Sequence, residues 1–299
     1  MKNLIITGCT GQLGTALNRL FEGNEEYHLV NTDVVDKEGV TRLDITKVED
    51  VVALAKEVQP YAIINCAAFT AVDAAEQKLD LCYQINAIGA RNMAIAANAV
   101  GAKLVHISTD YVFPGTSERP LTEFDPTGPK SVYGITKLAG ENFVRELCSR
   151  YFLIRTAWLY GEGKNFVRTM LKLSETHDKL TVVSDQFGSP TSAKELAKAI
   201  AYLLPTDNYG LFHGTCEGST SWDVFAREIF RLAGKNTEVI SVTSEEYAAM
   251  NPQSAPRPHY SILDNYMFRL TTDHVYADWQ TALYDYMEEQ GYLAGQEKA

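Results

Sequence analysis

Tyr133 and Lys137 carry the side chains best suited to proton transfer, and they stand four residues apart in the stretch SVYGITK. On a helix this spacing places both side chains on one face. An ammonium group beside a phenol favours the phenolate, so we expect Lys137 to lower the Tyr133 pKa from about 10 toward the working pH. Such pairs are common on helix surfaces, so the pair by itself does not establish catalysis.

Ser108 and Thr109 place hydroxyl groups at the end of an apolar run, residues 103–108, that we expect to be a strand. Ligands of open α/β sheets bind at the carboxyl ends of the strands, where either hydroxyl could hydrogen-bond a substrate carbonyl. A glycine-rich segment, TGCTGQLG at residues 7–14, directly follows another short apolar run. A glycine loop, a strand-end hydroxyl and a Tyr/Lys pair in this order predict an oxidoreductase that transfers a hydride with a nicotinamide cofactor.

The glycine loop has the pattern of a dinucleotide site. Gly8 can make the tight turn, Gly11 lets backbone amides approach a pyrophosphate, and Gly14 permits close packing of the following helix. Two residues separate each glycine from the next, a spacing typical of short-chain dehydrogenases. Turn glycines without a ligand are the alternative. The cofactor contacts that we expect in this loop are Gly8, Thr10, Gly11, Gln12, Leu13 and Gly14.

Asp33 lies nineteen positions beyond Gly14, at the end of the expected second strand. An acidic residue there can accept hydrogen bonds from the adenosine ribose, which favours NAD. Lys37 or Arg42 could hold a 2′-phosphate, so NADP stays open, and Asp33 could also only cap a turn. For some of the residues named next, a solvated acidic side chain or ordinary sheet packing is an alternative explanation. The further cofactor contacts that we expect are Asp44, Ile45, Cys66, Ala67, Ala68, Thr70, Tyr133 and Lys137.

The elements that position these residues alternate along the first half of the chain. Nearly continuous apolar runs alternate with helix-length stretches, which is the pattern of a parallel sheet with helices on both faces. We expect strands at residues 4–7, 28–32, 62–65, 103–108 and 152–155, with helices at 12–21, 48–58, 81–100 and 133–147. Later helices are expected near residues 165–176, 194–204 and 281–289, and a proline-containing loop at 251–258.

This pattern predicts the α/β class, with a Rossmann-like doubly wound parallel sheet and a smaller α/β substrate-binding domain. Residues 1–157 would form the NAD(P)-binding domain, to which a helix near 193–204 returns. Residues 158–299 would form mainly the substrate-binding region.

Composition limits the possible functions. The formal net charge is −11, which argues against a nucleic-acid surface because phosphate binding needs clustered basic residues. The five cysteines are scattered without a close pair and indicate a reducing, cytoplasmic compartment. The six histidines show no paired ligand spacing, so we expect no metal site. No apolar run suggests a membrane span or an export signal.

These motifs resemble those of the extended short-chain dehydrogenases and, among them, the dTDP-4-dehydrorhamnose reductase family. The resemblance covers nearly the whole chain. It is carried by GCTGQLG at residues 8–14, NCAAFTAVDAAE at 65–76, STDYVF at 108–113, YGITK at 133–137, RTAWLYG at 155–161, DQFGSPT at 185–191, and Arg257-Pro258 with Ser261 and Leu263.

The resemblance implies reduction of the ketone at position four of dTDP-4-keto-L-rhamnose to give dTDP-L-rhamnose. By carry-over, Thr109 hydrogen-bonds the ketone, Tyr133 donates the proton, and Lys137 tunes Tyr133 and grips the ribose. Core packing is an equally good explanation for Val72 and Trp158. The residues implied to bind the nucleotide sugar are Val72, Ser108, Thr109, Asp110, Tyr111, Trp158 and, near the diphosphate, Arg257.

At one position the chain departs from the family pattern, and two other functions compete with the one that the resemblance implies. Some family members bridge a metal-linked dimer through an acidic residue early in the first helix, where this chain has Thr15-Ala16-Leu17, so a magnesium requirement is doubtful. One rival is a regulatory subunit that keeps the fold and binds NADP without turnover. The other is a reductase or epimerase of a different nucleotide sugar. A monomer and a homodimer are both open.

Overall fold

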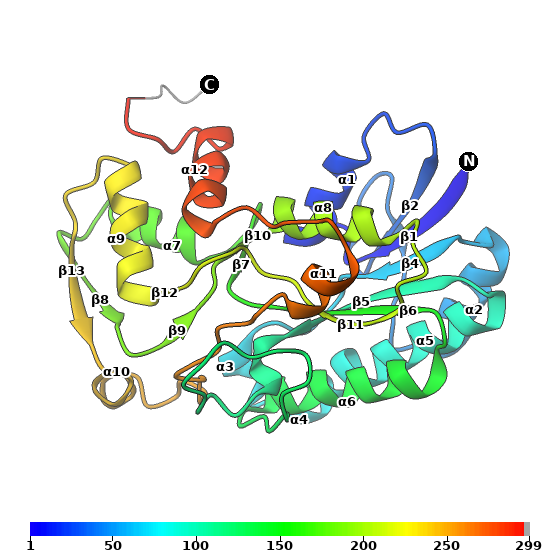
Figure 1. Cartoon of the computed structure of the whole chain (residues 1–299), viewed down its shortest axis with the longest axis horizontal. Coiled ribbons are helices and arrows are strands. Elements are labelled where there is room, and N and C mark those ends of the chain that lie inside the picture. The colour runs from blue at the N-terminus through cyan, green and yellow to red at the C-terminus, as the bar shows by residue number, and fades with distance from the viewer. Residues whose placement is uncertain (296–299) are drawn as a thin grey trace.

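A seven-stranded parallel sheet forms the centre of the protein in the computed structural model, which describes residues 1–295 (Figure 1). The strand order is β11-β6-β5-β4-β1-β2-β3, so the chain starts inside the sheet and reaches one edge before it crosses to the other. All five strands expected from apolar runs are present. The strands are β1 (Lys2–Thr7), β2 (Tyr27–Asp33), β3 (Thr41–Arg42), β4 (Ala62–Asn65), β5 (Lys103–Thr109), β6 (Tyr151–Thr156) and β11 (Gly210–His213).

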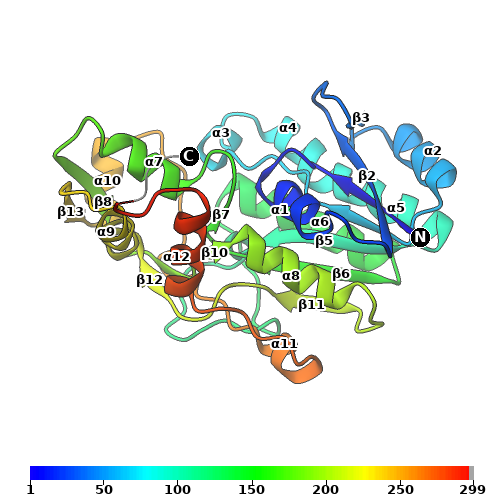
Figure 2. The same ribbon diagram turned by 90° about the horizontal axis from the view of Figure 1, so that it is seen from above.

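Helices cover both faces of the sheet (Figure 2). A first apolar cluster, with Leu17 and Ile200, lies under one pair of helices, and a second, with Met93 and Val144, lies on the opposite face. The prediction of a doubly wound α/β fold is therefore confirmed. The first face carries α1 (Gln12–Leu20) and α8 (Ala193–Leu203), and the second carries α2 (Val48–Val58), α5 (Gly89–Val100) and α6 (Val132–Leu147).

The single helix expected over residues 81–100 is interrupted. α4 (Leu79–Tyr83) passes into a π-helical turn (Gln84–Ile88), which continues as α5. Asn86 lies buried in that turn, where its side chain hydrogen-bonds the Phe69 backbone N at 2.8 Å and carbonyl O at 3.2 Å. A π turn widens the helix by one residue. The turn thus brings a polar side chain of this helix to the segment that follows β4.

The second region surrounds its own apolar cluster, which includes Phe225, Ile229 and Leu283. Its short strands pair two by two: β7 (Leu159–Tyr160) with β10 (Thr191–Ser192), β8 (Lys179–Val183) with β13 (Glu238–Val242), and β9 (Phe187–Gly188) with β12 (Thr220–Ser221). Its helices are α7 (Phe166–Leu173), α9 (Trp222–Leu232), α10 (Ser244–Met250) and α12 (Trp279–Glu289), while α3 (Val72–Ala75) contacts α6 and α11 (Tyr266–Thr271) packs on β11.

The division of the chain at residue 157 stays a prediction. Two elements beyond that residue, α8 and β11, lie in the layers of the central sheet. Residues 251–258 contain neither helix nor strand, as the three prolines suggest.

A buried ion pair joins α6 to the sheet. Arg155 of β6 and Glu141 of α6 are 1% and 0% exposed, and the guanidinium Nε and Nη2 contact the two carboxylate oxygens at 2.8 Å and 2.7 Å. Ser108 of β5 donates its hydroxyl to the same carboxylate at 2.6 Å. Because a buried charge without a partner is strongly unfavourable, each member of this cluster depends on the others.

We expect Arg155→Leu to lower the free energy of unfolding by about 3–5 kcal/mol, because it leaves the Glu141 carboxylate buried without its bidentate partner. The matched control is Arg231→Leu, which breaks the exposed pair with Glu228 and should leave the stability nearly unchanged. Urea denaturation followed by circular dichroism measures both. Equal stability of the two variants would show that Glu141 does not need Arg155.

Candidate active site

α6 carries Tyr133 and Lys137 to the carboxyl edge of the sheet. The helix begins at Ser131, whose hydroxyl accepts a hydrogen bond from the Gly134 backbone N at 3.2 Å. A Cβ atom on Gly134 would lie 2.3 Å from the carbonyl O of Tyr111, so a larger residue does not fit. The first turn of α6 therefore rests directly on the residues that follow β5.

Thr109 ends β5 at this contact. Its buried hydroxyl donates to Asp110 Oδ1 at 2.9 Å and accepts a hydrogen bond from the Tyr111 backbone N at 3.2 Å. The Tyr111 ring packs edge-on against Tyr133, with centroids 5.5 Å apart. The Thr109 hydroxyl is also close enough to Tyr133 to favour its phenolate. The structure thus brings the strand-end hydroxyl and the phenol together.

Burial controls the protonation of both candidate catalytic side chains on α6. Removal from water raises the Tyr133 pKa above its usual value, and the Thr109 hydroxyl offsets only part of this effect. The same loss of water lowers the Lys137 pKa to about 8. Our expectation that Lys137 lowers the Tyr133 pKa is therefore wrong here, because desolvation of the phenol dominates. Tyr133 keeps its proton at neutral pH, as a proton donor must.

Lys137 is anchored to the strand that carries Thr109. Its Nζ donates a hydrogen bond to the Ile107 carbonyl O at 2.5 Å, and the side chain is almost fully buried. Ile107 is two residues before Thr109 in β5. This bond holds the ammonium group at the same sheet edge as Thr109.

The glycine loop between β1 and α1 has the shape of a phosphate cradle. Gly8 adopts a φ of +63°, and a Cβ atom there would lie 2.8 Å from the Ala67 backbone N. A Cβ atom on Gly14 would lie 2.4 Å from the Gly8 carbonyl O, so loop and helix meet through their backbones. No side chain caps α1 at Gly11, which leaves the amides of its first turn available to an anion. These features fit the diphosphate of a dinucleotide.

Asp33 ties the end of β2 to this loop. Its Oδ2 accepts hydrogen bonds from the backbone N of Thr10 at 3.1 Å and from its hydroxyl at 2.6 Å, while Oδ1 accepts one from Val34 N at 2.7 Å. Arg42 is the register partner of Asp33 on β3. An acid suited to a ribose and a base suited to a 2′-phosphate thus lie side by side, so the preference between NADH and NADPH stays open.

The remaining predicted cofactor contacts differ in exposure. Asp44 is exposed and closes a turn by accepting hydrogen bonds from the backbone N and hydroxyl of Thr46, at 2.9 Å and 2.7 Å. Ile45 is buried, and its side chain lies against Gly89. Of the others, Leu13 is buried, Gln12, Cys66, Ala67 and Ala68 are half-buried, and Thr70 is exposed.

The predicted substrate residues come from separate segments. Ser108 gives its hydroxyl to Glu141, whereas Thr109 faces Tyr133, so the structure favours Thr109 between the two hydroxyls left open by the sequence. Val72 is half-buried at the start of α3. Asp110 is buried, and within the described residues its Oδ2 has no hydrogen-bond partner.

Trp158 follows β6 with a φ of +48°, an uncommon conformation for a bulky residue. Its indole stacks on that of Trp222, with ring centroids 3.5 Å apart and planes 9° apart. A Cβ atom on Gly188 would lie 2.5 Å from the Trp158 ring. Packing therefore holds this side chain firmly, and any contact with a substrate would use its half-exposed edge.

Three polar residues that sequence reasoning missed support the site. Asn86 in the π turn also lies within hydrogen-bond distance of the Thr136 hydroxyl, at 3.2 Å, and so links the segment after β4 to α6. Glu141 anchors Ser108 and Arg155. Asp73 binds Arg257 from a segment distant in sequence. Of the three, only Glu141 could have been indicated by the sequence, because it lies one helical turn beyond Lys137 on the same helix face.

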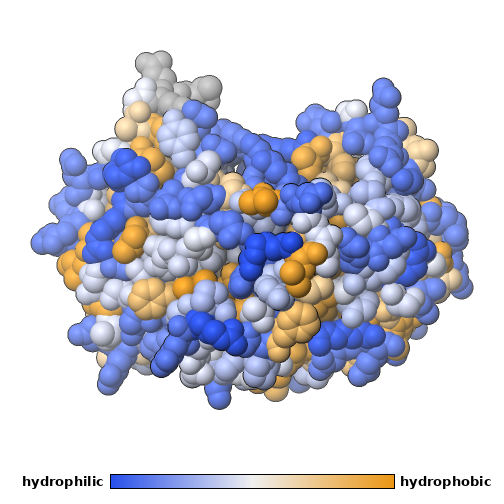
Figure 3. All heavy atoms as spheres, in the orientation of Figure 1, coloured by the Kyte–Doolittle hydropathy of each residue, from blue (hydrophilic) through white to orange (hydrophobic). Residues whose placement is uncertain are grey.

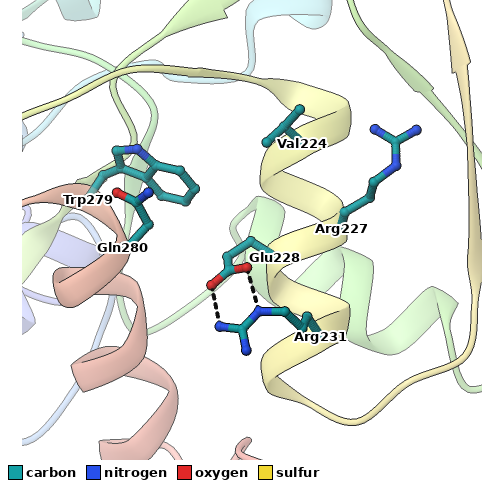
Figure 4. Close-up of a pocket in the computed structure, with 6 residues that line it drawn as sticks. All are labelled: Val224, Arg227, Glu228, Arg231, Trp279 and Gln280. Atoms are coloured by element: carbon teal, nitrogen blue, oxygen red, sulfur yellow. Dashed lines mark hydrogen bonds and ion pairs between the residues drawn. The ribbon is translucent and has the colours of Figure 1, made fainter.

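A hollow of about 360 Å³ lies elsewhere, between α9 and α12 (Figure 4). Two arginines line it, but Arg231 is bound to Glu228 inside the hollow and Arg227 pairs with Asp223. Paired charges of this kind offer little attraction to an anionic ligand.

Residues 1–295 contain no group of three or more side chains placed to hold a metal ion. None of the helices in this range has the length and apolar character needed to cross a bilayer. On the face shown in Figure 3, polar residues predominate and apolar residues are scattered among them.

The strand order, the glycine loop after β1 and the Tyr/Lys helix at the carboxyl edge define a Rossmann-fold oxidoreductase of the extended short-chain dehydrogenase type. The chain belongs to the dTDP-4-dehydrorhamnose reductase family, whose model, described as RmlD substrate binding domain, matches residues 1–291.

Known relatives agree over almost the full length. A solved dTDP-4-dehydrorhamnose reductase from Clostridium acetobutylicum is 48% identical with a TM-score of 0.91, covering 96% of this chain and 99% of that one. A Bacillus anthracis dTDP-4-dehydrorhamnose reductase in complex with NADP is 43% identical with a TM-score of 0.89, covering 97% and 99%. A dTDP-4-keto-6-deoxy-D-glucose reductase from Streptomyces niveus is 38% identical over 284 residues, 93% of this chain and 94% of the relative.

We expect kcat/KM for reduction to be level near neutral pH and to fall as pH rises through about 8, because burial lowers the Lys137 pKa to about 8 and the ammonium form is lost above it. Initial rates from pH 6.5 to 10 measure this profile, since kcat/KM reports ionisations of the free enzyme. Circular dichroism over the same range checks that the protein stays folded. A level profile up to pH 9.5 would contradict the assignment.

Proposed function

We propose that the protein reduces the C4 ketone of dTDP-4-keto-L-rhamnose to give dTDP-L-rhamnose, with NADH or NADPH as the reductant. The observation that carries the proposal is Tyr133, a phenol that keeps its proton, beside Thr109 at the same sheet edge as the glycine loop. Membership of the reductase family supports the substrate.

The cofactor would lie across the carboxyl edge of the sheet. The backbone amides at the start of α1 would hold its diphosphate, with Gly8 and Gly14 keeping the loop close to the helix. Asp33 would meet the adenosine ribose and Lys137 the nicotinamide ribose. When bound, the reduced nicotinamide supplies the hydride.

Tyr133 then supplies the proton. As negative charge develops on the ketone oxygen, the Tyr133 hydroxyl donates its proton and the Thr109 hydroxyl donates a hydrogen bond. In this structure the Thr109 hydroxyl donates its hydrogen to Asp110, and it would rotate to donate to the ketone instead. The phenolate that remains on Tyr133 would lie one helical turn from Lys137, whose ammonium would offset part of its charge.

Two alternatives stay distinct from this proposal. A regulatory subunit that binds NADP without turnover does not need Thr109, Tyr133 and Lys137, and all three are present together here. Reduction of a different dTDP-keto sugar is the second alternative, and the name of the Streptomyces niveus relative favours it as a candidate.

We also propose that the protein works in the cytoplasm, as a monomer or homodimer, without a nucleic-acid or membrane partner. All five cysteines are unpaired thiols in the structure, which suits a reducing compartment.

We expect Tyr133→Phe to lower kcat by about 10²- to 10⁴-fold, because the ring is kept and only the proton donor is lost. The dissociation constant of the reduced cofactor should stay within about twofold of the wild-type value. Oxidation of NADH or NADPH in the presence of dTDP-4-keto-L-rhamnose, followed by absorbance, measures turnover. Fluorescence titration measures cofactor binding.

The control for this variant is Tyr284→Phe on α12, which removes an exposed hydroxyl and should leave the rate unchanged. Wild-type turnover in Tyr133→Phe would exclude Tyr133 as the acid. A wild-type protein that oxidises the cofactor only with another dTDP-keto sugar would replace the substrate, and one that binds cofactor but reduces none would favour the regulatory subunit.

A further inference from the structure

Asp73 connects α3 to a segment nearly two hundred positions further along the chain. Its carboxylate accepts hydrogen bonds from Arg257 Nη2, at 2.9 Å for Oδ1 and 3.0 Å for Oδ2, and from the Ala255 backbone N at 2.9 Å. The residues involved belong to the segment after α10, which Figure 1 shows passing beside α3. One carboxylate thus fixes both the backbone and the cationic side chain of this segment.

Arg257 lies close to the proposed site. Its neighbour Pro258 packs on Gly115, four residues beyond Tyr111, where a Cβ atom would lie 2.5 Å from the Pro258 Cα. Burial raises the pKa of the Tyr111 phenol, and the positive charge of Arg257 offsets part of this effect. Tyr111 in turn packs edge-on against Tyr133. The order Asp73, Arg257, Tyr111, Tyr133 therefore leads from the outside of α3 to the proton donor.

The guanidinium of Arg257 is held in place but keeps N–H donors that no protein group within residues 1–295 accepts. It contacts Asp73 through Nη2 and the Ala255 carbonyl O through Nη1, at 3.2 Å. A guanidinium has five N–H donors, so others remain for an anion. Its side chain is 28% exposed, so solvent and ligands can reach it.

The Asp73–Arg257 pair is poorly placed to stabilise the fold. The Asp73 side chain is 53% exposed, and ion pairs at such positions contribute little to stability. A long side chain that is fixed before the ligand arrives, however, loses less conformational freedom on binding. The geometry therefore suits preorganisation for binding better than stabilisation.

We propose that Asp73 is a positioning residue, which holds Arg257 in place to bind the diphosphate of the nucleotide-sugar substrate. The inference rests on the proposed function for the kind of ligand. It assigns to Asp73 no contact with the substrate. The consequence is that the loss of Asp73 weakens binding of the substrate diphosphate through Arg257, while the cofactor diphosphate, at the start of α1, is not affected.

The test measures the binding of dTDP and of thymidine to the full-length protein by isothermal titration calorimetry, directly and by competition between the two ligands. We expect Asp73→Asn, which keeps the shape but not the charge, to raise the dTDP dissociation constant by about tenfold, a loss of about 1.4 kcal/mol. Thymidine and NADPH should bind as to the wild type. In an Arg257→Met background, Asp73→Asn should cause no further loss.

Glu228→Gln is the matched control, because it neutralises the acid of another surface ion pair, and it should leave dTDP binding unchanged. Thermal denaturation should give similar melting temperatures for Asp73→Asn and the wild type. Unchanged or tighter dTDP binding in Asp73→Asn overturns the inference. So does equal weakening of thymidine, or a full effect that persists in the Arg257→Met background.

The two proposals fail in different ways. Normal reductase activity together with unchanged dTDP binding in Asp73→Asn would overturn the role of Asp73 alone. The expected tenfold loss in a protein that reduces no dTDP-keto sugar would overturn the proposed function alone. Failure of the wild-type protein to bind dTDP overturns both.

Discussion

The carboxylate of Glu141 is the fixed point on which the geometry of the site depends. It is fully buried, and a charge in that position must be surrounded by donors. The donors come from β5 through Ser108 and from β6 through Arg155, while Arg145 adds a contact from α6 itself at 3.0 Å. Rotating or sliding α6 would break several of these bonds at once. The helix that carries the phenol is therefore registered against the strand that carries Thr109.

That registration places two ionisable groups at one sheet edge, Lys137 buried and Tyr133 half-buried, where the loss of water shifts their pKa values in opposite directions. It raises the pKa of the neutral acid Tyr133 and lowers that of the cation Lys137, because low dielectric disfavours the charged form of each. A raised pKa keeps Tyr133 in the protonated form that a proton donor needs, but it also makes the phenol a weaker acid, so transfer to a developing alkoxide depends on stabilising the phenolate that is left. The paired charges needed after the transfer arise only when the phenolate appears beside the ammonium. The site is thus arranged for the transition state more than for the resting protein.

The sequence predicts the sheet well because each central strand is buried on both faces and reads as an apolar run. It misses β3, whose two residues are exposed, and β11 at the other edge of the sheet. It also misses the paired strands of the second region, of which β7, β9, β10 and β12 have only two residues each, while β8 and β13 are partly exposed. The sequence also gives no signal for the helix interruption at Gln84–Ile88, because the hydrogen bonds between Asn86 and Phe69 that accompany it depend on tertiary contact. The wrong expectation for the Tyr133 pKa has the same origin: spacing shows that Lys137 is near, but only the folded structure shows how far each group is removed from water.

The same distinction separates the two halves of the candidate site. The predicted cofactor contacts at Gly8, Asp33 and Ala67 lie at the carboxyl ends of three neighbouring strands of one sheet, so local patterns and the parallel topology bring them together. The predicted substrate contacts at Val72, Trp158 and Arg257 depend on packing between segments far apart in sequence, such as the indole stack of Trp158 on Trp222 and the bond from Arg257 to Asp73. None of these residues belongs to the glycine loop or to the Tyr133–Lys137 stretch. Selectivity among keto sugars can therefore change while the hydride and proton chemistry stays the same, which is why the motifs identify the reaction more firmly than the sugar.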